Sequence, residues 1–160
     1  MSKWYGNVMN RLEEGKTVPE IKKDMDITMY LWSDRNCYYV KEVYDQKHIL
    51  VHEYEVCADK EKADGMGHQE WLYFKTHAEM NEYLRKYDPD RNWPEFERKD
   101  EVWVFRYNKW MKEVTYTDPN YCDTERERKH LLNHGYFCKY YDLPGKVSFG
   151  RRNYYYDWSF

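Results

Sequence analysis

Two histidines and two cysteines toward the end of the chain are the residues best suited to bind a metal. His130 and His134 are four residues apart in a predicted helix, so their imidazoles lie on one face. Cys122 precedes His130 by eight residues, and Cys138 follows His134 by four. Four nitrogen and sulfur ligands suit a structural tetrahedral zinc site, although this spacing matches no standard zinc finger. The alternative interpretation places the histidines on a solvated helix and the cysteines in the core.

A second group with chemical potential is the strand-like segment 48–56, which contains two histidines and two glutamates. A metal-dependent nuclease or nucleotide hydrolase would need imidazole and carboxylate groups that converge on one metal ion or water. The alternation of the strand places His48 and His52 on one face and Glu53 and Glu55 on the other. This separation argues against a compact catalytic site within the strand.

Aromatic residues interleaved with basic residues form the third group. Aromatic rings stack on bases and arginine holds phosphates, so such segments are typical of nucleotide or single-strand binding sites. Tyrosine, tryptophan and arginine are also the usual anchors of protein interfaces. The residues that we expect to bind a partner or ligand are Arg106, Tyr107, Trp110, Tyr140, Arg151, Arg152 and Tyr154.

The composition restricts the class of protein. Among 160 residues there are 18 Tyr, 7 Trp and 6 Phe, which is enough aromatic surface to build a core and to leave rings exposed. The net charge of -3 provides no general attraction for nucleic acid, so a duplex-binding regulator is the weakest of the binding hypotheses. No stretch is apolar enough to span a membrane, and the charged N-terminus favours a cytoplasmic protein with reduced cysteines.

Known catalytic signatures are missing from the sequence. It contains no P-loop or dinucleotide-binding glycine pattern, no GxSxG nucleophile motif and no HExxH zinc motif. An enzyme is therefore less expected than a binding protein. No cofactor is expected apart from the zinc ion considered above.

The hydrophobic pattern predicts a mainly β, α+β protein. A tight turn is expected at Asn108-Lys109. Asp123-Thr124 is expected to cap the start of a helix that Gly135 ends. Residues 1–160 are expected to form one domain, either a small antiparallel SH3-like barrel or a bent meander sheet with two short inserted helices. Its core would span 27–117, with the aromatic segment 135–160 packed on it. The expected strands are 27–32, 37–44, 48–56, 69–75, 101–107 and 110–117, and the expected helices are 77–87 and 123–134.

The two ends of the chain carry a resemblance to known sequences. The opening runs from Gly6-Asn7 through Asn10-Arg11-Leu12-Glu13-Glu14-Gly15-Lys16-Thr17-Val18-Pro19-Glu20-Ile21-Lys22 to Leu31-Trp32-Ser33-Asp34-Arg35. Together with the loop Asp64-Gly65-Met66 and the tyrosine-rich end 150–160, it resembles small uncharacterised proteins encoded by bacteriophages and prophages. The resemblance implies an accessory protein that acts in a bacterial cytoplasm. It implies no reaction, and the segment 77–143 has no counterpart in it.

These observations together favour a non-enzymatic phage protein that binds and neutralises a host component, with host immunity as the expected target. One alternative is the sequestration of a signalling nucleotide in a pocket of aromatic and arginine side chains. A second alternative is a metal-dependent nuclease or nucleotide hydrolase. The expected partner is a host protein or a nucleotide. The sequence leaves open whether the protein forms a homo-oligomer.

Overall fold

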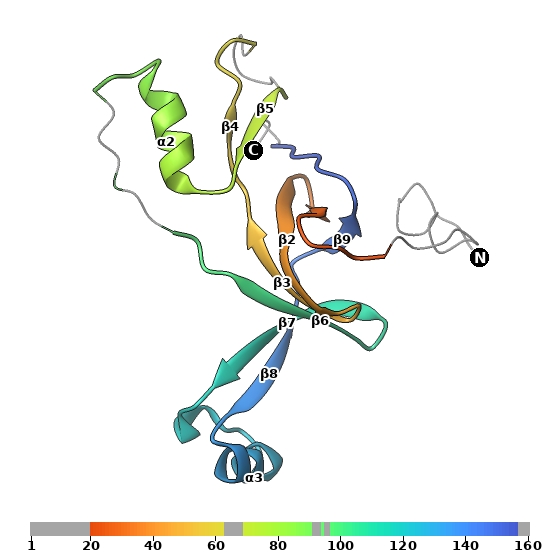
Figure 1. The fold of residues 1–160 in the computed structure, drawn as a ribbon. Coiled ribbons are helices and arrows are strands. Elements are labelled where there is room, and N and C mark those ends of the chain that lie inside the picture. Colours follow the sequence, from red (N-terminus) through yellow and green to blue (C-terminus); the bar gives the residue numbers. More distant parts are fainter. Residues whose placement is uncertain (1–19, 63–68, 91–93, 95–96, 157–160) are drawn as a thin grey trace, which may run out of the picture.

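A computed structural model describes residues 20–62, 69–90, 94 and 97–156 of the chain. The N-terminal motif before Glu20, the loop motif Asp64-Gly65-Met66 and the final four residues lie outside this part. The main element is a seven-stranded antiparallel sheet in the order β8-β7-β6-β3-β2-β1-β9 (Figure 1). Its strands are β1 (Asp26–Tyr30), β2 (Arg35–Asp45), β3 (His48–Glu53), β6 (Glu101–Arg106), β7 (Lys109–Tyr116), β8 (Phe137–Asp142) and β9 (Lys146–Phe149).

The sheet is bent so that its two edges approach each other. The link between the edge strands β8 and β9 contains only residues 143–145. Seven flat strands would separate the edges by about 29 Å, whereas such a link reaches about 14 Å at most. The rings of Trp110 on β7 and Phe149 on β9 accordingly lie 5.3 Å apart. A side chain at Gly145 would meet the Tyr30 carbonyl oxygen at 2.0 Å, so glycine is required in this link.

The mainly β, antiparallel α+β prediction is confirmed, but the SH3-like barrel is not. In the described residues β8 and β9 are both edge strands and do not pair with each other. The bent sheet, which was the other predicted form, describes the molecule better. Within the predicted aromatic segment, residues 137–149 supply both edge strands and residues 150–156 pack on the sheet.

The main hydrophobic core lies inside the bend. Ile27, Val40, Ile49, Val51 and Trp103 are fully shielded from solvent. Burying such a set of side chains is the main favourable contribution to the folding free energy. The alternating pattern of the sequence therefore predicts this face of the sheet correctly.

A smaller unit sits at one end of the sheet. It consists of the two-stranded sheet of β4 (Glu55–Ala58) and β5 (Trp71–Phe74), together with the helix α2 (His77–Arg85). The predicted strand 48–56 is thus divided between two sheets. Its first part packs in the main core, whereas Tyr54 joins a second cluster with Cys37 and Tyr39. Because the alternation of side chains continues through residues 48–56, the sequence does not reveal that the two parts of this segment pack in different cores.

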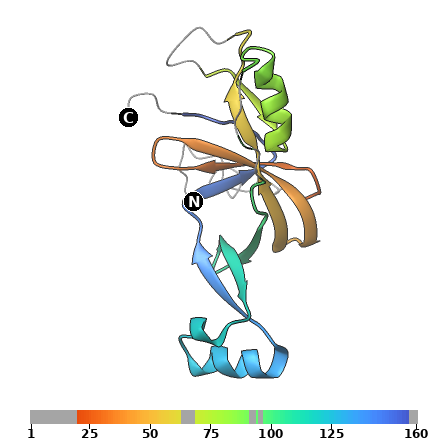
Figure 2. The ribbon, with the colours of Figure 1, turned by 90° about the vertical axis from the view of Figure 1, so that its left-hand side faces the viewer.

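The opposite end of the molecule carries the helix α3 (Glu125–His134), as Figures 1 and 2 show. Thr124 and Glu127 form a capping box, and Gly135 ends the helix with a φ of 84°, so the predicted start and end are confirmed. A short 3-10 turn (Pro119–Tyr121) connects β7 to this helix. The tight turn of the β6–β7 hairpin falls one residue earlier than predicted. Tyr107 and Asn108 have φ values of 54° and 60°, which is typical of a type I′ turn.

Candidate functional site

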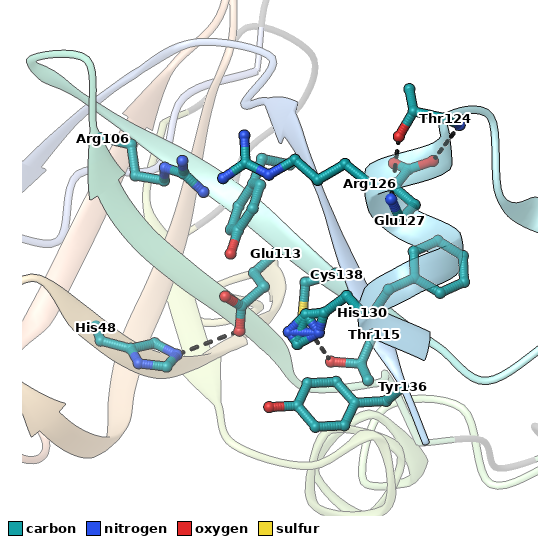
Figure 3. A pocket seen from close by; sticks show the side chains of 12 residues that line it. His48, Arg106, Glu113, Thr115, Thr124, Arg126, Glu127, His130, Tyr136 and Cys138 are labelled. Atoms are coloured by element: carbon teal, nitrogen blue, oxygen red, sulfur yellow. Dashed lines mark hydrogen bonds and ion pairs between the residues drawn. The ribbon is translucent and has the colours of Figure 1, made fainter. Parts of the chain in front are cut away.

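A cavity of about 690 Å³ lies between α3 and strands β6, β7 and β8, and we call it the α3 pocket (Figure 3). Its volume is within the range of roughly 300–1,000 Å³ that is typical of small-molecule sites. The side chains that line the pocket come from strands β3, β6, β7 and β8, from α3, and from residues that adjoin these elements. The lining residues are His48, Arg106, Glu113, Thr115, Thr124, Arg126, Glu127, His130, Tyr136, Phe137, Cys138 and Tyr140.

Stacked aromatic rings hold the helical end of this pocket on the sheet. Tyr116 of β7 stacks on Tyr121 on one side and on Phe137 of β8 on the other, with ring centroids 5.0 and 5.5 Å apart. Phe137 is almost completely buried, whereas α3 itself has no buried residue. The helix is held by its caps, by its two connections and by contacts with β8 and the adjoining Tyr136, without a fully buried side chain of its own.

Two arginines dominate one end of the α3 pocket. The Arg106 guanidinium lies over the Tyr140 ring, with 3.9 Å between the guanidinium carbon and the ring centroid. Figure 3 shows the side chains of Arg106 and Arg126 pointing toward one another from β6 and α3. Neither arginine forms an ion pair with a carboxylate in the part of the chain that the structure describes. Two cations that face each other without a counter-ion form a local excess of positive charge.

Acidic and ring groups occupy the other end. His48 Nε2 lies 3.3 Å from Glu113 Oε1, and Glu113 is mostly buried. Burial raises the pKa of the Tyr140 hydroxyl, and the negative charge of Glu113 raises it further. His130 contacts the Tyr136 ring at 5.2 Å between centroids, and its buried Nδ1 has no hydrogen-bond partner.

The four predicted zinc ligands are not arranged as one site. Cys122 is buried, and the rings of His130 and His134 lie 4.3 Å apart. Cys138 Sγ lies 3.5 Å from the hydroxyl oxygen of Thr115. Within the described ranges, no three histidine, cysteine or acidic side chains are grouped as metal ligands. The zinc site stays a prediction without a formed geometry to support it.

The seven predicted binding residues are divided between four environments. Arg106 and Tyr140 line the α3 pocket, and Tyr107 is exposed at the hairpin turn. Trp110 packs between Phe105 and Phe149 against the main core. Trp110 is partly buried in this position, and its binding role stays a prediction.

Arg151, Arg152 and Tyr154 belong to a segment, 150–156, that we call the C-terminal strap. The Arg152 guanidinium lies over the rings of Tyr73 at 4.2 Å and Tyr54 at 5.4 Å. The backbone N–H of Tyr154 donates to the Tyr73 hydroxyl oxygen at 2.9 Å.

The strap is also fixed to the main sheet. The Thr28 hydroxyl donates to the Arg151 carbonyl oxygen at 2.8 Å and accepts from the Asn153 N–H at 3.1 Å. A pair of backbone hydrogen bonds joins Arg35 to Tyr155. These contacts attach the strap to β1, β2 and β5, and they engage the side chain of Arg152 and the backbone of its neighbours within the fold.

The histidines of β3 have separate partners. His48 pairs with Glu113 of β7, whereas His52 Nδ1 lies 2.6 Å from Asp100 Oδ1. Arg98, in turn, binds Glu55 at 2.5 Å. These pairs border a second cavity of about 650 Å³, whose walls share Glu113 with the α3 pocket. His48 and His52 thus pair with carboxylates on different elements, and Asp100 also binds Lys41 at 2.9 Å, so the two imidazoles do not converge on one carboxylate.

Sequence reasoning missed Arg126, Glu113 and Tyr136 as pocket residues. Arg126 is one of several charges at the start of α3, and nothing in the sequence distinguishes it from Arg128. Arg106 and Arg126 are brought near each other by the tertiary structure, because the chain runs from β7 into α3 and back into β8. The local signals that did point to the pocket were the aromatic and basic residues Arg106 and Tyr140 and the candidate ligands His130 and Cys138.

No helix in the described ranges has the length and apolar character needed to cross a membrane. Comparisons with known protein families, with characterised proteins and with solved structures find no match to this chain.

Proposed function

We propose that this chain is a non-enzymatic binding protein whose α3 pocket takes a small phosphorylated ligand. The observation that carries the proposal is the approach of Arg106 and Arg126, without carboxylate partners, to one end of a cavity of ligand size. Guanidinium groups bind phosphate oxygens through paired, charge-assisted hydrogen bonds. An anion between these two groups would also relieve their mutual repulsion.

The Tyr140 ring supports the same interpretation. Its cation–π contact at 3.9 Å restricts the Arg106 side chain before any ligand arrives. A pre-positioned arginine loses less conformational entropy on binding, which favours affinity. Arg126 is exposed, and the capping box only fixes the backbone from which it extends.

The resemblance to phage-encoded proteins supports a role for this binding. In the proposal the protein acts in the bacterial cytoplasm and neutralises a host component by sequestering a phosphorylated small molecule, with host defence as the setting. Occlusion of a host protein, the other route considered from the sequence, stays a prediction because no particular surface in the described residues favours it.

Calorimetric titration with inorganic pyrophosphate tests the proposal. Arg106→Gln and Arg126→Gln should each weaken binding by about 10-fold or more, because each removes charge-assisted hydrogen bonds. Arg128→Gln is the matched control, since Arg128 is exposed on α3 and does not line the pocket. Absence of binding at millimolar pyrophosphate, or equal weakening by Arg128→Gln, would overturn the proposal.

The alternative function, nucleotide hydrolysis, is tested by measuring the release of phosphate from ATP. ATP incubated with the protein and magnesium should be recovered intact if the protein only binds. Release of phosphate that His48→Ala abolishes, while Arg128→Gln preserves it, would replace the binding proposal with hydrolase activity.

A further inference from the structure

The α3 pocket has two chemically different ends. Figure 3 shows Arg106 and Arg126 together on one side, and His48, Glu113, His130 and Tyr136 toward the other. We call the second group the ring end. A ligand with a phosphate and nothing else would use only the arginine end of the cavity of about 690 Å³.

The ring end repels phosphate and favours hydrogen-bonding rings. Glu113 provides a mostly buried carboxylate there, which would face an anion at high electrostatic cost. The other carboxylate of the pocket, Glu127, is already engaged, because its Oε1 accepts from the backbone N–H groups of Asp123 and Thr124 at 2.6 and 3.2 Å. Charge therefore orients a phosphorylated ligand with its phosphate toward Arg106 and Arg126.

His130 identifies what occupies the ring end. Its Nδ1 is buried and lacks a hydrogen-bond partner, and its ring contacts the Tyr136 ring. A buried polar nitrogen without a partner is uncommon in folded proteins and calls for an explanation such as a ligand. Glu113, whose Oε1 lies 3.3 Å from His48 Nε2, lines the same cavity with its carboxylate, so the ring end offers a side-chain nitrogen, an acceptor and an aromatic face.

We infer that the ligand is a nucleotide, with its phosphate between Arg106 and Arg126 and its base at the ring end. This inference rests on the proposed function and adds the class of ligand. A base supplies a flat surface for Tyr136 and His130, together with donors and acceptors at its edge for Glu113 and His130 Nδ1. A sugar phosphate has hydroxyl groups that can hydrogen-bond there but no flat surface for the two rings, and inorganic phosphate has neither.

Calorimetric titrations with AMP, GMP, CMP and UMP, each compared with ribose 5-phosphate, test the assignment. At least one nucleotide should bind about 10-fold tighter than ribose 5-phosphate, which is the size of effect expected from one stacked base. His130→Ala should remove that difference while leaving the affinity for ribose 5-phosphate unchanged. Lys129→Ala is the control, because Lys129 is exposed on the same helix and does not line the pocket.

The outcomes separate the two proposals. Equal affinity for ribose 5-phosphate and all four nucleotides would overturn the base assignment and leave phosphate binding intact. Failure of every phosphorylated probe to bind, including pyrophosphate, would overturn the proposed function itself. Should His130→Ala disturb folding by near-ultraviolet circular dichroism, Tyr136→Ala makes the same comparison from an exposed residue. Retention of the full nucleotide preference in a folded variant would contradict the assignment.

Discussion

Arginine lies on tyrosine in two regions of this protein, with opposite consequences. In the α3 pocket, Arg106 contacts Tyr140 and points toward a second arginine. In the C-terminal strap, Arg152 covers Tyr73 and Tyr54 while the backbone on either side of it is hydrogen-bonded to Thr28 and Tyr73. The contacts are similar, but only the pocket keeps positive charge facing a cavity. The surroundings of such a pair, rather than the pair itself, distinguish the proposed binding site from a structural contact.

Loss of the Thr28 hydroxyl should have the largest effect on the strap. Thr28→Val keeps the shape of this fully buried side chain but leaves the Arg151 carbonyl and the Asn153 N–H without their partner. The free energy of unfolding should fall by about 3 kcal/mol, measured by urea denaturation. Pyrophosphate affinity should stay the same, because the α3 pocket lies at the other end of the molecule. A matching loss of affinity would mean that the two regions are coupled.

Replacing the strap arginine should have a moderate effect on stability. Arg152→Gln removes two cation–π contacts, so the free energy of unfolding should fall by about 1–2 kcal/mol. Arg151→Gln is the control, because only the backbone of Arg151 takes part in a described contact, and it should change stability by less than about 0.5 kcal/mol. If both variants lowered the free energy of unfolding equally, the Arg152 side chain would contribute no more to stability than the Arg151 side chain, and the prediction would be wrong.

The helix cap should link stability to the pocket. Thr124→Ala breaks the capping box and should lower the free energy of unfolding by about 1 kcal/mol. Because Arg126 lies in the first turn of α3, fraying of that turn should also weaken pyrophosphate binding by a few-fold. Denaturation and titration of the same sample check both effects. Stability loss with wild-type affinity would show that the position of Arg126 does not depend on the cap.

The smallest expected effect has the opposite sign. Arg126→Gln removes one of two positive charges that face each other, so the ligand-free protein should gain a few tenths of a kcal/mol in low salt. The gain should disappear at about 1 M salt, where charges are screened within about 3 Å. Thermal unfolding at both salt concentrations measures it. A loss of stability instead would mean that Arg126 supports the fold.

Local signals predicted much of the fold. The two-residue alternation located β1, β2, β6 and β7, and Thr124 and Gly135 marked the ends of α3 because capping depends on neighbouring residues. The division of 48–56 into β3 and β4 was missed, since both parts alternate but pack in different cores. The edge strands β8 and β9 were missed because tyrosine-rich segments suit a strand and a packed tail equally well.

The candidate site was only partly predictable. Arg106 and Tyr140 were expected to bind, and they lie together because β6 and β8 both pair with β7. Arg152 carried the same local signal and proved to be part of the strap. Arg126 could not be selected from the sequence, because its relation to Arg106 depends on where α3 is placed across β8.

A double-mutant cycle between Arg106 and Arg126 tests the central claim most directly. Pyrophosphate affinity would be measured for the wild type, Arg106→Gln, Arg126→Gln and the double variant. If both guanidinium groups bind one anion, the effects should deviate from additivity by about 1 kcal/mol or more. Effects that add within about 0.3 kcal/mol would show that the two arginines act independently, and would contradict a shared phosphate site in the α3 pocket.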